Sequence, residues 1–396
     1  MTAFPKQEYD ERLIKVKEEM ERAGVELLLI SDPANMNYIT GYDGWSFYVS
    51  QMVMIFIDEP EPYWFGRGQD VNGAKATTWL PESHLLSYGD EFVHAKTKHP
   101  MDEAGRWLKS KGKHAKRIGV ELDAYYFSAK AMNHLEQALP DAAFADTTNL
   151  VNYVRMIKSD REITFMKRAA AIAEEAMNEG IRAIQEGTRT CDIAAAISSA
   201  QIRGANGIGG DYPAIVPLIP AGELTFAPHL TWTDEPLKKG EPIIIELAGC
   251  YRRYHAPLAR TVVLGKPDAE LQRLAYAVTE GIENTLDSIR PGLTCEEIEG
   301  VWRNTISKHG FNKDSRIGYS IGVNYPPDWG EHTASIRPGD HTILQPNMAF
   351  HLIPGIWLDN MGVEISESFI VTDKGCETLV DYPRSLIVQP GFSTAI

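Results

Sequence analysis

The chain has 396 residues, and its 54 acidic and 39 basic side chains give a formal net charge of -15. With 43% apolar and 23% charged residues, the composition is that of a folded globular protein, which excludes collagen, coiled coil and intrinsic disorder. The negative charge repels phosphate backbones and anionic lipids, so neither nucleic acid nor a membrane is an expected partner. At roughly 150 residues per domain, the length predicts two or three folding units.

The cysteines occur without a CxxC pair, which is typical of reduced thiols rather than of a disulfide framework or a zinc finger. The N-terminal residues MTAFPKQEYDERLIK are polar and lack the apolar segment of a signal peptide. No run approaches the roughly 18 apolar residues that a membrane-spanning helix requires. We therefore expect a soluble, cytoplasmic protein.

The first part of the chain alternates helical and extended patterns. In residues 11–23, the apolar Leu13, Val16 and Met20 fall on one helical face, and Gly24 ends the pattern. The other elements predicted here are helices over 100–109 and 129–139 and strands over 25–30, 52–57 and 63–65. Such alternation predicts a compact α/β domain with a mixed sheet over residues 1–155.

The pattern changes near residues 149–159, after which helices and strands are longer and less regularly alternated. The predicted helices cover 160–185, 269–289 and 295–309, and the predicted strands cover 243–247, 261–264, 348–352 and 367–372. Helices on one side of an antiparallel sheet make an α+β fold, so residues 156–396 are expected to form a second, larger domain.

No general catalytic motif is present, neither GxSxG, HExxH, a phosphate-binding loop nor a dinucleotide fingerprint. The stretch RLIKVKEEMERAGVELLLISDPANMNYITGY nevertheless resembles the N-terminal domain of the creatinase/aminopeptidase P/prolidase superfamily. Four later blocks resemble that superfamily's pita-bread catalytic domain, in the same order: IIIELAGCYRRYHAPLARTVVLG, RIGYSIGVNYPPDWGE, LQPNMAFHLIPGIW and GVEISESFIVTDKG. The resemblance implies a creatinase-type N-terminal domain followed by a pita-bread catalytic domain.

Metallopeptidases of this superfamily hold two divalent ions with Asp, Asp, His, Glu and Glu. The matching positions here are occupied by Glu246, Pro257, Tyr319, Ile353 and Ser366. Pro and Ile side chains have no lone pair to donate, and neutral hydroxyls are poor ligands for a hard divalent ion. We therefore expect no metal and no other cofactor, which makes peptidase activity improbable.

Metal-free hydrolysis remains, for which creatinase is the superfamily's precedent. The N-domain stretches YITGYDGWSFYV and FGRGQD resemble those of its ectoine-hydrolysing members. The resemblance implies a hydrolase that opens the cyclic amidine ring of ectoine to an N-acetylated diaminobutyrate, and the sequence leaves open whether it accepts hydroxyectoine.

Two carboxylates are candidates for the chemistry. Glu246 follows a buried apolar run, and there it would serve as nucleophile or general base and attract the amidinium. The alternative is a structural ion pair with Arg252 or Arg260. Strand alternation aims Glu364 to the same side as Ser366, so Glu364 is either the nucleophile, a holder of the second amidine nitrogen, or a salt-bridge partner.

Two histidines occupy positions of interest. His229, in FAPHLTW, aligns with the family's catalytic histidine and would shuttle protons near neutral pH, or else be an ordinary core or surface residue. His351 replaces a small residue beside one of the former metal positions, so it either contacts substrate or packs.

Aromatic and basic residues complete the predicted substrate site. Either a flat cation stacks on part of the N-domain aromatic run, or these side chains fill the core. The run consists of Tyr42, Trp45, Phe47 and Tyr48. Arg67 or Arg260 would bind a substrate carboxylate, or form a structural ion pair instead. Other residues in the family's site-lining blocks are Tyr319, Tyr325, Trp329 and Trp357.

The resemblance also implies a homodimer, because an N-domain loop of one subunit commonly reaches the other subunit's site. A downstream deacetylase is a possible further partner. The rival functions are a creatinase-type amidinohydrolase, a metal-dependent Xaa-Pro peptidase and a non-catalytic family member. Creatinase's other catalytic glutamate aligns with Ala259, which argues against a creatine reaction. The sequence leaves open whether a glutamate attacks carbon directly or activates water, and which ring C–N bond breaks.

Overall fold

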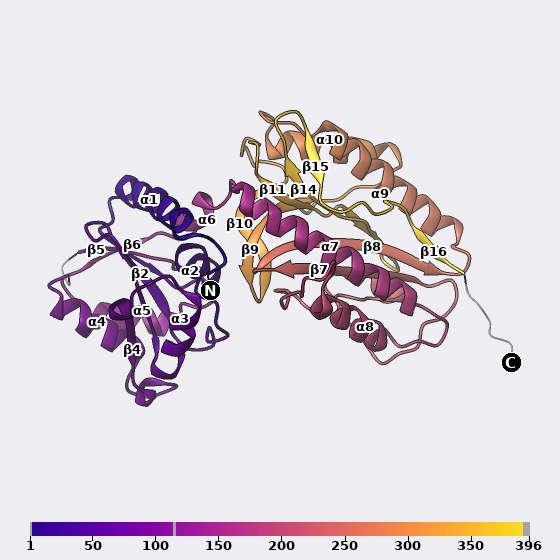
Figure 1. Ribbon diagram of the computed structural model, residues 1–396. Helices are drawn as coiled ribbons and strands as arrows, with labels where there is room; N and C mark the ends of the chain where they lie inside the picture. The colour runs from indigo at the N-terminus through magenta and orange to yellow at the C-terminus, as the bar shows by residue number, and fades with distance from the viewer. Residues whose placement is uncertain (1, 114–115, 391–396) are drawn as a thin grey trace. The chain divides into compact units, whose positions relative to one another are not determined.

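The computed structural model describes residues 2–113 and 116–390 (Figure 1). The chain forms two compact units, Met1–Arg155 and Met156–Ile396. No helix among the described residues is long and apolar enough to cross a membrane.

The first unit is a mixed sheet with helices packed against it. Its helices are α1 (Lys6–Ala23), α2 (Pro33–Thr40), α3 (Val71–Thr77), α4 (Pro100–Ser110), α5 (Ala129–Ala138) and α6 (Leu150–Val154). Its strands are β1 (Leu27–Ile30), β2 (Met52–Phe56), β3 (Tyr63–Arg67), β4 (Leu85–Tyr88), β5 (Arg117–Val120) and β6 (Ala143–Asp146). They are ordered β4-β3-β2-β1-β5-β6, and β2 runs antiparallel to both of its neighbours. The predicted α/β unit with a mixed sheet is confirmed.

Helix α2 was not predicted, and its environment explains why. Every one of its residues is buried, so it has no polar face and no amphipathic period. The local signal lies at its start, where the Asp32 carboxylate accepts a hydrogen bond from the backbone N–H of Ala34 and Pro33 occupies the first helical turn.

The second unit carries the longer elements. Its helices are α7 (Asp160–Ala183), α8 (Thr190–Arg203), α9 (Ala269–Ser288) and α10 (Cys295–Lys308). The long strands are β7 (Pro242–Tyr251), β8 (Tyr254–Leu264), β9 (Gly318–Tyr325) and β10 (Asp328–Ile336). The shorter ones are β11 (Ala349–Leu352), β12 (Gly355–Trp357), β13 (Gly362–Glu364), β14 (Glu367–Val371), β15 (Cys376–Thr378) and β16 (Ile387–Gln389).

The main sheet of this unit follows the order β15-β14-β11-β9-β8-β16, with β7 paired to β8 and β10 to β9. Its neighbours run antiparallel except β16 and β8, which are parallel. Strands β12 and β13 form a separate antiparallel hairpin. The α+β fold is confirmed.

Two hydrophobic cores attach the helices to this sheet. Figure 1 shows α7 and α8 grouped near β7, and α9 and α10 grouped apart from them near β15. One core joins α7 and α8 to β7 and β8, and the other joins α9 and α10 to β10, β11 and β14 and to the hairpin. At Gly249 a Cβ would lie only 1.9 Å from the backbone oxygen of Ala169, so glycine lets α7 pack directly on β7. The sheet is thereby covered on the helical side.

Candidate active site

Strand alternation turns a row of polar side chains away from the two hydrophobic cores. On β7, Ile245 and Leu247 belong to the core, so Glu246 between them points to the opposite face of the sheet. The same alternation places His351 of β11 and Glu364 of β13 opposite their core-facing neighbours. These residues define the candidate active site.

Glu246 is a buried carboxylate, with an exposed fraction of 5%. In the β7–β8 register it lies opposite Ala259, and the backbone of Leu218 bonds to its own backbone on the other side. Burial raises the pKa of Glu246 well above its ordinary value, and the negative charges of Glu364 and Asp328 raise it further. Its backbone is therefore fixed while its carboxyl group favours the protonated form.

Glu364 is equally buried, with an exposed fraction of 3%. Its N–H donates to the hydroxyl of Thr261 at 2.8 Å, and that hydroxyl donates to the carbonyl of Glu364 at 2.8 Å. The Oε1 atom has no hydrogen-bond partner among the described residues. Burial raises the pKa of Glu364 to about 7, although the Lys313 ammonium opposes the shift.

Taken together, Glu246 and Glu364 are two carboxyl groups whose mutual repulsion disfavours double ionisation. The titration of such a pair belongs to the pair rather than to either residue. One member can then accept a proton or attack while the other donates. Two carboxyl groups that differ in protonation can supply an acid and a base to one reaction.

A hydrogen-bonded chain of side chains lies beside the carboxylates. The Trp329 indole N–H donates to the hydroxyl oxygen of Tyr319 at 2.8 Å. That hydroxyl lies 3.1 Å from Nδ1 of His351, whose Nε2 is 2.8 Å from the hydroxyl of Ser366. The Ser366 hydroxyl also accepts the N–H of Ala259 at 2.6 Å. The chain fixes the Tyr319 hydroxyl in a set position.

The side chains in this series of hydrogen bonds are uncharged at neutral pH. Burial lowers the pKa of His351 to about 3, and the Arg316 guanidinium contributes to the shift, so the imidazole is uncharged at neutral pH. Burial raises the pKa of Tyr319, and the nearby Glu246 carboxylate raises it further, so the phenol keeps its proton. His351 therefore helps to hold the Tyr319 hydroxyl in position and does not act as a cationic acid.

Tyr325 and Trp357, the remaining residues predicted from the site-lining blocks, each lie next to a cationic side chain. Tyr325 is buried, and the Arg253 guanidinium lies 5.3 Å from its ring centroid. Trp357 is half-buried, and the Lys313 ammonium lies 4.0 Å from its ring centroid. Lys313 acts electrostatically on Glu364, which places Trp357 at the carboxylates.

His229 is not part of this cluster as the structure has it. It is exposed, in the loop that precedes β7, and has a positive φ of 68°. No hydrogen bond or ion pair among the described residues links it to Glu246 or Glu364. Its role as proton shuttle stays a prediction.

The N-domain aromatic run is divided between core and surface. Tyr42 is buried, 5.2 Å from the Trp64 ring, and fills the core of the first unit. Trp45 and Tyr48 are 57% and 58% exposed, unusual for such large rings, and Phe47 is half-buried against Trp45 at 4.9 Å. Tyr42 is therefore a core residue, and the role of Trp45, Phe47 and Tyr48 in stacking on a substrate stays a prediction.

Neither predicted arginine offers a free guanidinium. Arg67 pairs with Asp90 within the first unit. Arg260 is completely buried, pairs with Glu367, and donates to the carbonyls of Ser366 and Tyr382. Arg260 is thus the structural ion pair that the sequence allowed as the alternative.

The side chains present do not fit the dinuclear metal centre of the related peptidases. Pro257 and Ile353 offer no donor atom, and the hydroxyls of Tyr319 and Ser366 are held in the chain of hydrogen bonds. Over residues 2–113 and 116–390, no group of three or more His, Cys, Asp and Glu side chains is placed to hold a metal ion. Glu246 is the ligand position that keeps a carboxylate.

Sequence reasoning missed Lys313, Arg316 and Asp328 as charged groups of the site. Arg316 and Asp328 lie inside the block that contains Tyr319, and Lys313 lies three residues before that block begins. Burial would raise the pKa of Asp328, but hydrogen bonds from His332 and a backbone N–H lower it. The position of these charged residues in or next to a recognised block was the signal that could have found them.

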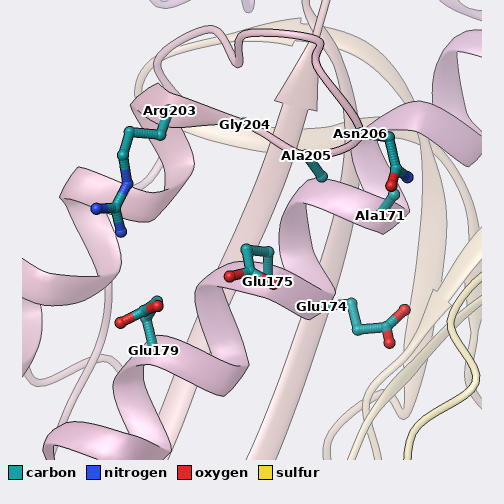
Figure 2. A pocket seen from close by; sticks show the side chains of 8 residues that line it. All are labelled: Ala171, Glu174, Glu175, Glu179, Arg203, Gly204, Ala205 and Asn206. Atoms are coloured by element: carbon teal, nitrogen blue, oxygen red, sulfur yellow. The ribbon is translucent and has the colours of Figure 1, made fainter.

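A separate cleft of about 590 Å³ lies along α7. Figure 2 shows Glu174, Glu175 and Glu179 on this helix, with Arg203 and Asn206 across from them. Because α7 packs on the face of β7 from which Glu246 points away, this cleft is distinct from the carboxylate pair. Its acidic side chains do not by themselves define a site.

Comparison with known proteins assigns the class. Residues 164–373 match the model of metallopeptidase family M24, and residues 12–157 match the creatinase/prolidase N-terminal domain. The chain belongs to this family of pita-bread proteins, and the expectation of a hydrolase acting on carbon–nitrogen bonds is confirmed.

Among individual proteins, the ectoine hydrolase of Halomonas elongata is 46% identical over 393 residues, covering 98% of each chain. The Xaa-Pro dipeptidase of Pyrococcus horikoshii is 24% identical over 382 residues, covering 96% of this chain and 99% of its own. The crystal structure of the prolidase from Pyrococcus horikoshii superposes with a TM-score of 0.81 at 23% identity, covering 95% of this chain and 100% of that one. The latter likeness establishes the fold.

Proposed function

We propose that the protein opens the cyclic amidine ring of ectoine by hydrolysis, without a metal ion, to give an N-acetylated diaminobutyrate. The observation that carries this proposal is the buried pair of Glu246 and Glu364 where the related peptidases build their metal centre. The similarity to the Halomonas elongata ectoine hydrolase supports the choice of substrate.

The charge of the pair suits the substrate. Ectoine carries a delocalised amidinium, and a carboxylate in a dry site attracts such a cation more strongly than it would in water. Binding of the cation also lowers the pKa of the facing carboxyl group, so the substrate itself favours the ionised, reactive form. Glu246 and Glu364 therefore both hold the ring and become active when it is bound.

Hydrolysis adds the oxygen of water to the carbon between the two nitrogens and breaks one C–N bond. Because the donor set does not fit two metal ions, a carboxylate would generate the nucleophile. Glu246 either removes a proton from water or attacks the carbon directly, after which water cleaves the adduct. The proton goes to the departing nitrogen, from the second carboxyl group or through His229.

Neighbouring side chains would shape the pocket. The Tyr319 hydroxyl, fixed by Trp329 and His351, would hydrogen-bond the reacting group, and Trp357 and Tyr325 would serve as aromatic walls. These three side chains would orient the substrate and would take no direct part in bond cleavage. Of the N-domain run, Trp45, Phe47 and Tyr48 would stack on substrate, whereas Tyr42 would support them from the core.

The exposed N-domain rings favour a homodimer. Trp45 and Tyr48 present large apolar surfaces, as expected for side chains that another subunit covers. In this arrangement the loop of one subunit would complete the site of its partner. Hydroxyectoine as a second substrate, a deacetylase that receives the product, and a cytoplasmic location belong to the same proposal.

A creatinase-type reaction is the alternative. Ala259 occupies the position of creatinase's second glutamate and lies opposite Glu246 in the β7–β8 register. A methyl group at this point supplies neither charge nor proton, so the creatine reaction would lack one of its carboxylates.

The experiment is a comparison of substrates by product NMR, with ectoine, hydroxyectoine, creatine and a Xaa-Pro dipeptide offered to the purified protein. We expect turnover of ectoine, and no loss of rate after exhaustive chelation. If the protein turned over creatine and none of the other compounds, creatine would replace ectoine as the proposed substrate. Loss of ectoine hydrolysis on chelation, restored by a divalent ion, would overturn the metal-free mechanism.

A further inference from the structure

A lysine that no family block contains lies at the carboxylate pair. Lys313 belongs to the segment between α10 and β9 and is half-buried. Its ammonium lies 4.0 Å from the ring centroid of Trp357, and its positive charge acts on Glu364. Among the described residues it forms no ion pair or hydrogen bond, so a partly buried cation remains available to a ligand.

The hairpin of β12 and β13 explains why the lysine is held there. In its register, Gly355 pairs with Glu364 and Gly362 with Trp357. A Cβ at Gly355 or Gly362 would lie 2.6 Å or 2.5 Å from the Trp357 indole, so the two glycines let the ring lie flat across the hairpin. Lys313 then stacks on a surface that the hairpin fixes in place.

Two further observations point to a missing ligand. The Nε1 atom of Trp357 is buried without a hydrogen-bond partner in the described structure, and so is Oε1 of Glu364. A buried unpaired donor and a buried unpaired acceptor each cost free energy, which a bound molecule recovers. The donor lies on the residue stacked with Lys313, and the acceptor belongs to the carboxylate pair.

The site thus has a cationic and an anionic part. We infer that Lys313, together with the indole N–H of Trp357, binds the carboxylate of a zwitterionic cyclic amidine, while Glu246 and Glu364 face its amidinium. This inference rests on the proposed function and assigns the carboxylate-binding role that Arg67 and Arg260 cannot fill, because both are engaged in ion pairs.

The test compares two substrates, ectoine and the same ring without its carboxylate. In Lys313→Met, we expect kcat/KM for ectoine to fall about tenfold to a hundredfold, chiefly through KM, because a charge-assisted hydrogen bond is lost. The value for the ring without a carboxylate should change less than about threefold. Lys313→Arg should keep most of the preference for ectoine, and Lys374→Met, at an exposed turn lysine, should behave as the wild type.

An equal loss on both substrates, or no loss on either, would overturn the inference while leaving the proposed function standing. If Lys313→Met does not fold, Lys313→Arg decides: loss of the preference for ectoine in this folded, charged variant likewise counts against the role. If the wild type neither binds ectoine in calorimetry nor turns it over, the proposed function fails and the inference falls with it. Binding of ectoine that weakens in Lys313→Met, without turnover by the wild type, would support Lys313 and reject the hydrolysis.

Discussion

Two buried acidic residues in the same unit have opposite electrostatic surroundings. Glu367 of β14 pairs with the fully buried Arg260, whose guanidinium also bonds to backbone carbonyls. Glu246 of β7 faces another carboxylate, Glu364, and its pKa rises far above the ordinary value because burial is reinforced by repulsion. Burial alone therefore does not mark the site; the sign of the neighbouring charge does.

The two pairs differ in how they affect the stability of the unliganded fold. A buried pair such as Arg260 and Glu367 is destabilising to break, since the remaining charge is left uncompensated. A like-charged pair destabilises the unliganded fold and is relieved when a cation binds. The same substitution, Glu to Gln, should therefore have opposite consequences at the two places.

The largest expected effect is on turnover. Glu246→Gln removes the nucleophile or base, so kcat for ectoine should fall by about three orders of magnitude. The melting temperature should stay the same or rise, because a repulsive charge is lost. Steady-state kinetics and calorimetric melting check this, and near-wild-type activity would transfer the chemical role to Glu364.

The second expected effect is on stability, at the ion pair of Arg260 and Glu367. Glu367→Gln leaves the buried Arg260 without its counter-ion, so the free energy of unfolding should fall by about 3 kcal/mol. The kcat of the protein that remains folded should be close to wild type. Urea denaturation combined with active-site titration measures both quantities, and unchanged stability would show that the ion pair is not the structural counterpart we describe.

The third expected effect, which reaches the size of the second only at its upper limit, is a pH dependence of stability. Because Glu364 has a pKa of about 7 when folded and an ordinary value of 4.5, its stabilising contribution is complete below about pH 4.5 and is lost as the pH rises through 7. Relative to wild type, Glu364→Gln should gain up to about 3 kcal/mol of stability between these limits. Denaturant midpoints at several pH values test the sign.

Glu235→Gln, at an exposed position, serves as the control and should leave the wild-type pH dependence unchanged. A Glu364→Gln curve parallel to that of wild type would contradict the idea that this carboxyl group is protonated at neutral pH in the fold.

Much of the secondary structure could be predicted because it is amphipathic. Residues 269–289 were expected to be a helix, and α9 covers Ala269–Ser288 with its apolar face in the core. Helix α8 was missed although Ile193, Ile197 and Ala200 recur at helical spacing, because alanine and serine dilute the contrast between its faces. Periodicity identifies a helix only where the polar face differs enough from the apolar one.

The candidate site was predicted in part. Glu246 and Glu364 followed from the resemblance and from strand alternation, and both lie in one buried cluster. His229 was assigned by alignment, and the structure leaves it exposed and without a bond to that cluster. An aligned position does not fix where a loop side chain lies, since loops lack the regular register of strands.

The sequence by itself determined the family, the alternation that turns Glu246 and Glu364 from the core, and the absence of donor atoms at Pro257 and Ile353. These are properties of single residues and of local periodicity. Only the tertiary structure decided which charges meet: that Arg260 is taken by Glu367, and that Lys313 lies on Trp357 beside Glu364. The physical reason is that electrostatic partnership depends on distance in space, which chain folding sets between residues far apart in sequence.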